Sequence, residues 1–201
     1  MVPATTQSPL LPEEIRVQLE AASPDYFAFF GGGECLTVDG DALRTRFYEQ
    51  SRLLHPDRFA RASAAERSDS LRASSLLNDA YRTLKDPLSR AEYVLTHHGF
   101  DIGEQRSNNV PPELLEEVFE LNMALDELRG GDQDARPQLE QAQARFASMR
   151  EECDTALTAL FAAWDERREH ETLGNIRAIL NRRRYIQNLI RDAEIALASS
   201  Q

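Results

Sequence analysis

The chain has 201 residues, of which 41% are hydrophobic, and a formal net charge of −11 at pH 7. This composition is sufficient for a packed core in one large or two small domains, and it is not typical of a fibrous or disordered protein. The negative charge argues against a nucleic-acid partner, which requires a basic surface, and no apolar run approaches the roughly 18 residues that a membrane span needs.

The N-terminal segment shows no targeting signal. The sequence MVPATTQSPLLPEE lacks the basic start and apolar stretch of a secretory signal. Cys35 and Cys153 form neither a zinc motif nor a disulfide framework, so we expect a reducing, cytoplasmic location. Residues 1–22 are expected to form a flexible arm with one short helix after Pro12. A short aromatic helix, DYFAFF, follows and ends at a run of three glycines.

Helical spacing continues through the first half of the chain, and alternating strand patterns are absent, so we predict an all-α fold. Asp39 is a suitable N-cap for a helix over residues 40–54. The capping box SAAE begins a long helix that extends to about Lys85. A shorter helix, LSRAEYVLTHH, ends at Gly99, and the polar residues 101–110 are expected to form a linker.

The first two long helices are separated by His55-Pro56-Asp57. One interpretation is helix punctuation, because proline cannot continue a helix and aspartate suits a turn. The preceding helix also presents basic and aromatic side chains on the side of the histidine, within roughly 80° of each other. These residues are Arg44, Tyr48, Arg52 and His55.

The second half is predicted to form an antiparallel bundle of three helices, because each has a heptad seam and the connections are short. The seam of the first helix, over residues 112–129, consists of Leu114, Val118, Leu121, Leu125 and Leu128. That of the second, which opens at Pro137, consists of Leu139, Ala142, Phe146, Met149, Cys153, Ala156, Leu160 and Ala163. That of the third, after Gly174, consists of Ile176, Ile179, Arg183, Ile186, Ile190, Ala193 and Leu197.

The helix over residues 112–129 carries more apolar residues than its seam requires. Leu115, Phe119 and Met123 lie off the seam at spacings of four, with Glu120 beside them. They form a second apolar stripe, which is expected either to bind a partner or to pack on the first domain or on the long second helix.

The order of these helices, with the motifs DYFAFFG, FYEQSRLLHPDRF, LNDAYRTLKDPLSRAEYVL and HHGFD, resembles a J domain over about residues 25–100. The ending DPLSRAEYVL followed by HGFD, and the three-helix bundle behind it, resemble more specifically the HscB family of J-domain co-chaperones in iron–sulfur cluster assembly. The resemblance implies a J domain at 23–100, a linker at 101–110 and a scaffold-binding three-helix domain at 111–198.

In that family the HPD motif and the adjoining basic helix dock on a 70-kDa heat-shock-type chaperone of the HscA/DnaK class and accelerate its ATP hydrolysis. The implied chaperone-binding residues are His55, Pro56, Asp57, Arg44, Arg52 and Arg58. The bundle would bind the IscU-like cluster scaffold and deliver it to the chaperone, which assists the maturation of iron–sulfur proteins. The implied scaffold-binding residues are Leu115, Phe119, Glu120, Met123 and Tyr185. Glu116 departs from the pattern, because an apolar residue is frequent there.

The resemblance leaves two other hypotheses open. One is a J-domain adaptor for a different client, and the other is a purely structural helical bundle in which HPD is only a turn. We expect neither an enzyme nor a cofactor, because His97-His98 and His170 lack metal-ligand spacing and no nucleophile–base pair is evident. The cysteine tetrad of some relatives is missing, so no zinc is expected.

Overall fold

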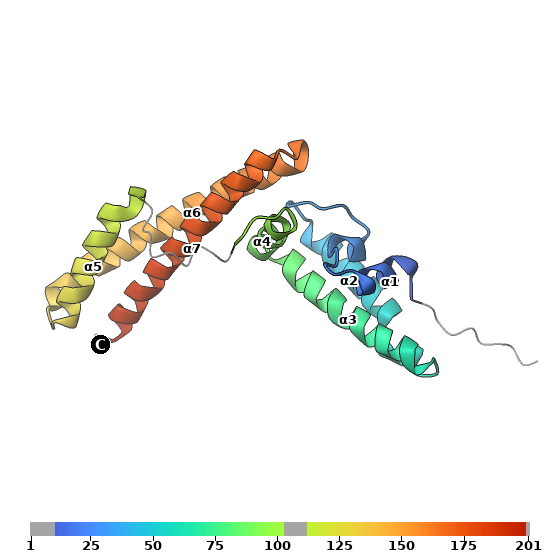
Figure 1. Cartoon of the computed structure of the whole chain (residues 1–201). Coiled ribbons are helices and arrows are strands. Elements are labelled where there is room, and N and C mark those ends of the chain that lie inside the picture. Colours follow the sequence, from blue (N-terminus) through green and yellow to red (C-terminus); the bar gives the residue numbers. More distant parts are fainter. Residues whose placement is uncertain (1–10, 103–111, 200–201) are drawn as a thin grey trace, which may run out of the picture. The chain divides into compact units, whose positions relative to one another are not determined.

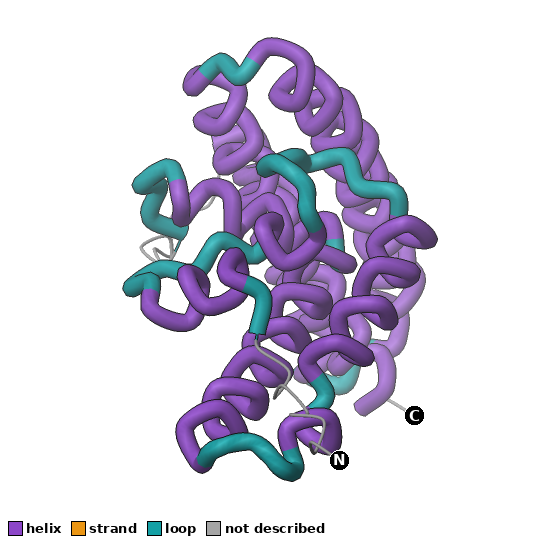
Figure 2. The backbone as a smooth tube through the Cα atoms, turned by 90° about the vertical axis from the view of Figure 1, so that its right-hand side faces the viewer, coloured by secondary structure: helices purple, strands orange, loops and turns teal. Residues whose placement is uncertain are grey.

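The computed structural model describes residues 11–102 and 112–199, and throughout these ranges the chain consists of helices and loops without a β-strand (Figures 1 and 2). The predicted all-α fold is confirmed. None of the helices in these ranges combines the length and the apolar character that a membrane crossing requires. The contacts divide the chain into two compact units, Met1–Val94 and Leu95–Gln201. The expected linker, 101–110, falls almost entirely outside the described residues.

The first unit is a helical hairpin with short elements packed around it. Its elements in chain order are α1 (Glu13–Glu20), the 3-10 helix η1 (Phe27–Phe30), α2 (Gly40–Leu54), the 3-10 helix η2 (Pro56–Phe59), α3 (Ala64–Lys85) and most of α4 (Pro87–His97). α2 and α3 form the hairpin, because the short η2 reverses the chain between them (Figure 1).

Local capping motifs set the helix ends as predicted. The Asp39 carboxylate accepts hydrogen bonds from the backbone N–H groups of residues 41 and 42 at the start of α2. Ser63 and Glu66 form the reciprocal capping box of α3. Gly99, which closes α4, has a φ of +78° in the left-handed region that favours glycine.

The N-terminal arm contains the predicted short helix after Pro12, but this helix packs on the first unit instead of forming part of a flexible arm. Residues 13–20 form α1, in which Ile15 is 3% exposed. Arg72 of α3 donates a hydrogen bond to the Leu19 carbonyl at 2.8 Å. Residues 11–20 are therefore packed on the first unit, because the apolar face of α1 must be covered by another surface. The sequence of this segment does not show which surface covers it. Residues 1–10 of the arm lie outside the described part of the chain.

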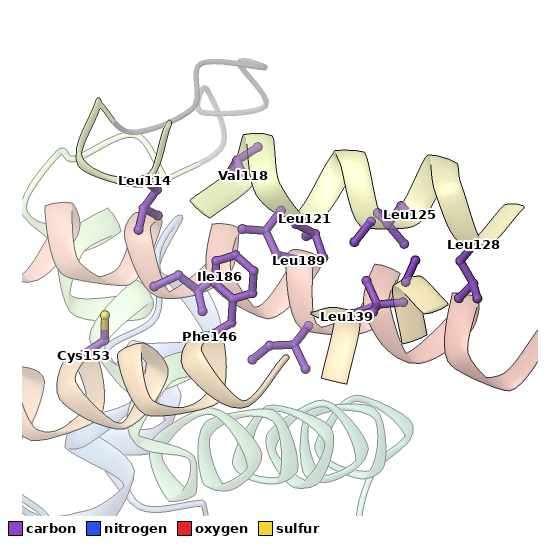
Figure 3. Close-up of a cluster of buried hydrophobic side chains, with 14 residues drawn as sticks. Leu114, Val118, Leu121, Leu125, Leu128, Leu139, Phe146, Cys153, Ile186 and Leu189 are labelled. Carbon is purple, nitrogen blue, oxygen red and sulfur yellow. The ribbon is translucent and has the colours of Figure 1, made fainter. Parts of the chain in front are cut away.

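The second unit is the predicted three-helix bundle. It contains α5 (Leu115–Arg129), α6 (Arg136–Arg167) and α7 (His170–Ser199), with short 3-10 helices η3 (Pro112–Leu114) and η4 (Gln133–Ala135) before α5 and α6. Its core joins the three helices along one seam (Figure 3). The predicted α5 seam is buried in full: Leu114, Val118, Leu121, Leu125 and Leu128.

The α6 seam follows the prediction as far as Cys153, with Leu139, Phe146 and Cys153 buried and with Ala142 and Met149 partly buried against the core. Beyond Cys153, Leu157, Phe161 and Trp164 are buried, whereas the predicted Ala156, Leu160 and Ala163 remain partly exposed. From Cys153 onward the buried residues are spaced by four, four and three, so the buried face lies one residue later than the strict repeat places it. This is the direction in which a straight α-helix drifts from a seven-residue repeat, by about 20° per heptad. The larger side chains are the ones buried, which increases the apolar area removed from water.

The turn before α7 also differs from the prediction. Gly174 lies inside α7, which already begins at His170. The chain reverses at Arg168, which has a φ of +56°, and the Arg168 N–H donates to the Trp164 carbonyl at 2.9 Å.

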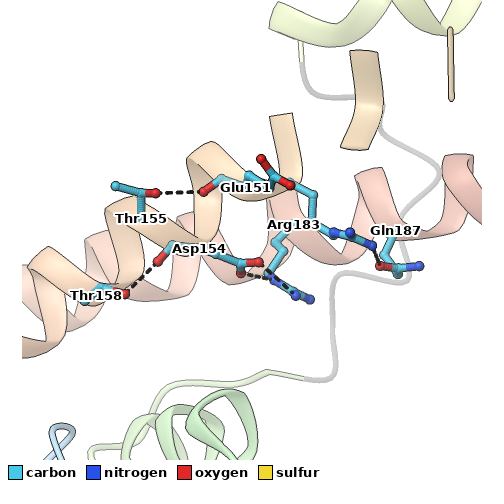
Figure 4. A network of polar contacts seen from close by, with 7 residues as sticks. Glu151, Asp154, Thr155, Thr158, Arg183 and Gln187 are labelled. Atoms are coloured by element: carbon cyan, nitrogen blue, oxygen red, sulfur yellow. Dashed lines mark hydrogen bonds and ion pairs between the residues drawn. The ribbon is translucent and has the colours of Figure 1, made fainter. Parts of the chain in front are cut away.

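Polar contacts complete the pairing of α6 and α7 (Figure 4). Arg183, predicted on the α7 seam, is half-buried and forms an ion pair with Asp154 of α6. Arg150 donates to the side-chain oxygen of Gln187 at 3.0 Å. A charged residue is tolerated on this seam because a carboxylate on the facing helix pairs with it.

Candidate functional site

The HPD motif forms the exposed turn at the tip of the α2–α3 hairpin. α2 ends at Leu54, His55 adopts an extended conformation, and Pro56 opens η2, where its missing N–H costs no helical hydrogen bond. His55 Nδ1 accepts a hydrogen bond from the Asp57 N–H at 3.3 Å and lies 3.6 Å from the Asp57 carboxylate. The two side chains are 58% and 91% exposed, so both are available to a partner.

Side chains of α3 stabilise the backbone at the start of this turn. The Leu54 carbonyl accepts hydrogen bonds from the hydroxyls of Ser70, at 2.8 Å, and Ser74, at 3.0 Å. Leu54 and Ser70 are fully buried, and Phe59 on the far side of the turn is 1% exposed. The turn therefore rests on a buried platform while His55 faces solvent. Neither serine was predicted from the sequence. The available signal was the position of Ser70, which lies three residues before Ala73 and seven before Leu77 and so shares their face of the helix.

The three predicted arginines are all exposed on the first unit. Arg44 forms an exposed ion pair with Asp41 at 3.0 Å, which contributes little to stability and leaves the cation accessible. Arg58 donates to the Arg52 carbonyl at 3.3 Å across the turn. Arg52 and Arg58 therefore lie close to the HPD motif, and Arg44 lies two helical turns before Arg52.

The second apolar stripe is exposed on α5. Leu115, Phe119 and Met123 are 55%, 65% and 49% exposed, whereas their neighbours on the seam are buried. The alternative in which the stripe packs on the long helix α6 is therefore wrong. Glu116 is exposed as well, immediately after the first residue of the stripe.

An ion-pair cluster borders the stripe on its α6 side. Arg145 of α6 lies 3.2 Å from the Glu120 carboxylate and 3.3 Å from that of Glu117. Beside it is a hollow of about 390 Å³ between α5 and α6. The hollow is lined by Glu120, Met123, Glu127, Gln138, Gln141, Ala142 and Arg145. Sequence reasoning singled out Glu120 but missed Arg145, which lies 25 residues further along the chain.

Tyr185 of α7 differs from the stripe residues in its environment. It is half-buried and packs against the bundle core, and this burial raises the pKa of its hydroxyl. Only part of the Tyr185 side chain is therefore exposed to solvent, in contrast to the stripe residues.

The described residues contain no cluster of three or more histidine, cysteine, aspartate or glutamate side chains that would hold a metal ion. Cys153 is buried in the bundle core, where burial raises the pKa of its thiol, so it is a structural side chain.

A helical hairpin with an exposed HPD turn, followed by a separate helical bundle, defines a J-domain protein. The model of the HSCB C-terminal oligomerisation domain matches residues 110–194. The structure of chaperone HscB from Vibrio cholerae is 26% identical with a TM-score of 0.60, over 88% of this chain and 99% of that chain. The structure of human co-chaperone protein HscB is 26% identical with a TM-score of 0.64, over 87% of this chain and 83% of that chain. These matches support the assignment of the chain to the HscB family.

Proposed function

We propose that this protein stimulates ATP hydrolysis by a 70-kDa heat-shock-type chaperone of the HscA/DnaK class and delivers an IscU-like iron–sulfur cluster scaffold to it. The similarity to HscB proteins supports a co-chaperone role in iron–sulfur cluster assembly. The observation that carries the finer proposal is the pairing of an exposed HPD turn on one unit with an exposed apolar stripe on the other. We propose residues 23–100 and 111–198 as the limits of the two functional domains.

For chaperone binding, the HPD turn presents exposed side chains on a backbone that is already ordered. Pro56 restricts the backbone, so little conformational entropy is lost on docking. The Asp57 carboxylate is free to pair with a cation of the partner, and Arg44, Arg52 and Arg58 attract an acidic partner surface over long range. The chain itself makes or breaks no bond, because hydrolysis takes place in the chaperone.

On the scaffold side, Leu115, Phe119 and Met123 provide apolar anchors on a rigid helix. Exposed apolar stripes of this kind mark interaction surfaces. Glu120 adds a carboxylate at the edge of the stripe, and Tyr185 adds a partly exposed phenol on the neighbouring α7.

The chaperone half of the proposal is tested by His55→Gln in single-turnover ATPase assays. Stimulation should be abolished while thermal unfolding is unchanged, because an exposed turn substitution of this kind costs under about 0.5 kcal/mol. Full stimulation by the variant would refute the proposed role of the motif and favour the purely structural interpretation of the turn.

The scaffold half is tested by Leu115→Ser combined with Phe119→Ser, with calorimetry against the scaffold. Loss of two anchors should reduce affinity by more than roughly tenfold, while stimulation of the chaperone without scaffold is kept. The matched control is Ile195→Ser, which alters an apolar residue of α7 that is 58% exposed and lies outside the stripe. If wild-type protein stimulates the chaperone but does not bind the scaffold, the protein is an adaptor for a different client.

A further inference from the structure

An exposed aromatic side chain lies between two of the arginines on α2. Tyr48 is 56% exposed and follows Arg44 by four residues and precedes Arg52 by four. Residues four apart on a helix are neighbours on its surface, so the three side chains form one row. The row runs toward His55, which caps the end of α2.

The ring of Tyr48 is supported by a chain of aromatic contacts that crosses to α3. Its centroid lies 5.6 Å from that of Phe47, with the planes tilted by 58°. Phe47 stacks on Tyr81 of α3, with centroids 4.2 Å apart and an interplanar angle of 21°. The Lys85 ammonium lies 5.9 Å from the centroid of the Tyr81 ring. The Tyr48 ring is thus restricted before any partner arrives, although its outer face remains in solvent.

This environment gives Tyr48 the properties of an interface anchor. A tyrosine has only two side-chain torsions, and a ring that is already supported loses little further entropy on binding. Tyrosine and arginine are also the side chains most enriched among residues that dominate binding energy. The flanking exposed cations speed encounter with an acidic surface, but exposed charges by themselves add little affinity. The Tyr48 ring, which lies between the two arginines in the row, supplies the apolar contact that they lack.

We propose that Tyr48 is the aromatic anchor of the chaperone-binding face, and that it determines affinity while His55 determines stimulation. The inference rests on the proposed function of the HPD turn. The partner surface is the chaperone's own docking site, and its chemistry follows from the row: acidic groups opposite Arg44 and Arg52, separated by an apolar cleft that accepts a phenol ring. Burying the exposed outer face of the ring in that cleft removes apolar area from water, which lengthens the lifetime of the complex.

The test is a titration of chaperone single-turnover ATPase activity with Tyr48→Ala, Tyr48→Phe and wild-type protein. Tyr48→Ala should raise the concentration for half-maximal stimulation by roughly tenfold or more, with the same rate at saturation. Tyr48→Phe, which keeps the ring, should stay close to wild type. The matched control is Leu71→Ala on α3, a 59% exposed apolar residue outside the row, which should leave the curve unchanged.

The comparison of His55→Gln, Tyr48→Ala and wild-type protein distinguishes a failure of the Tyr48 inference from a failure of the proposed function. If His55→Gln abolishes stimulation and Tyr48→Ala has the wild-type half-maximal concentration, Tyr48 is not an anchor and the inference is overturned. If Tyr48→Ala lowers the rate at saturation without shifting the midpoint, Tyr48 belongs to the stimulating step and the inference is equally overturned. If wild-type protein gives no stimulation, both the function and the inference fail. Circular dichroism melting of Tyr48→Ala should match that of the Leu71→Ala control.

Discussion

The two serine hydroxyls beneath the HPD turn give a quantitative prediction. Ser70 and Ser74 both donate to the carbonyl of Leu54, a residue that is fully buried. Ser70→Ala removes one bond and leaves the carbonyl paired, so we expect a loss of about 1 kcal/mol in the free energy of unfolding. Ser70→Ala with Ser74→Ala leaves a buried acceptor without a donor. Its desolvation adds a further penalty of about 1–3 kcal/mol, so the double variant should lose about 3–5 kcal/mol, more than the sum of the single losses.

Urea denaturation followed by circular dichroism measures these differences, and the melting midpoint should fall by about 4–8 °C for each kcal/mol in a unit of this size. The matched control is Ser75→Ala, an exposed serine on the same helix, which should change stability by less than about 0.5 kcal/mol. A double variant that loses no more than the sum of the single variants would refute the reasoning, because the carbonyl would then have another donor. If the double variant folds, its chaperone stimulation should fall, since the turn is no longer held at its N-terminal side.

Three further predictions follow from individual side chains. Arg44→Ala with Arg52→Ala should slow association with the chaperone in stopped-flow measurements. The wild-type association rate should fall with added salt, because electrostatic steering is screened beyond about 8 Å at physiological ionic strength. A wild-type rate that does not depend on salt and equals that of the variant would contradict this prediction. Leu121→Ala should cost about 2–5 kcal/mol in urea denaturation, because Leu121 is 1% exposed, whereas Leu115→Ala on the exposed stripe should cost far less; equal losses would exclude the separation of stripe and core. Burial raises the pKa of Tyr93 to about 12 from 10.0, so the folded state binds this proton more tightly than the unfolded state. The stability that this pKa difference contributes is complete below pH 10 and is lost as the pH rises toward 12. The melting midpoint of Tyr93→Phe should therefore fall less steeply than that of wild type between pH 10 and 12. An equal dependence of the two melting midpoints on pH would contradict this prediction.

Features that depend on neighbouring residues in the chain were predictable from the sequence. The Asp39 cap and the turn at Gly99 involve groups within a few residues of each other, so the local amino-acid sequence specifies them. The same holds for the two apolar rows of α5. Their spacings place Leu121 and Phe119 on different faces of any helix, and the burial of the first and exposure of the second follow from that geometry.

Features that depend on how two helices meet were not predictable. The α6 seam departs from its strict repeat after Cys153, because the buried face follows the actual helical twist and the position of α7. α1 packs on the first unit through Ile15, the one buried residue of that helix, and the spacing of residues within α1 does not specify the surface that covers it.

The all-α class, the HPD motif and the surplus apolar stripe can be read from the sequence, because they follow from composition and from periodicities of a few residues. The groups that support the turn and border the stripe can be identified only in the folded protein. The hydroxyl of Ser70 reaches a carbonyl 16 residues away, and Arg145 reaches carboxylates 25 and 28 residues away. Such contacts depend on the axial stagger and rotation of one helix against another. Side-chain packing sets both of these quantities, and the spacing of residues within a single helix does not encode them.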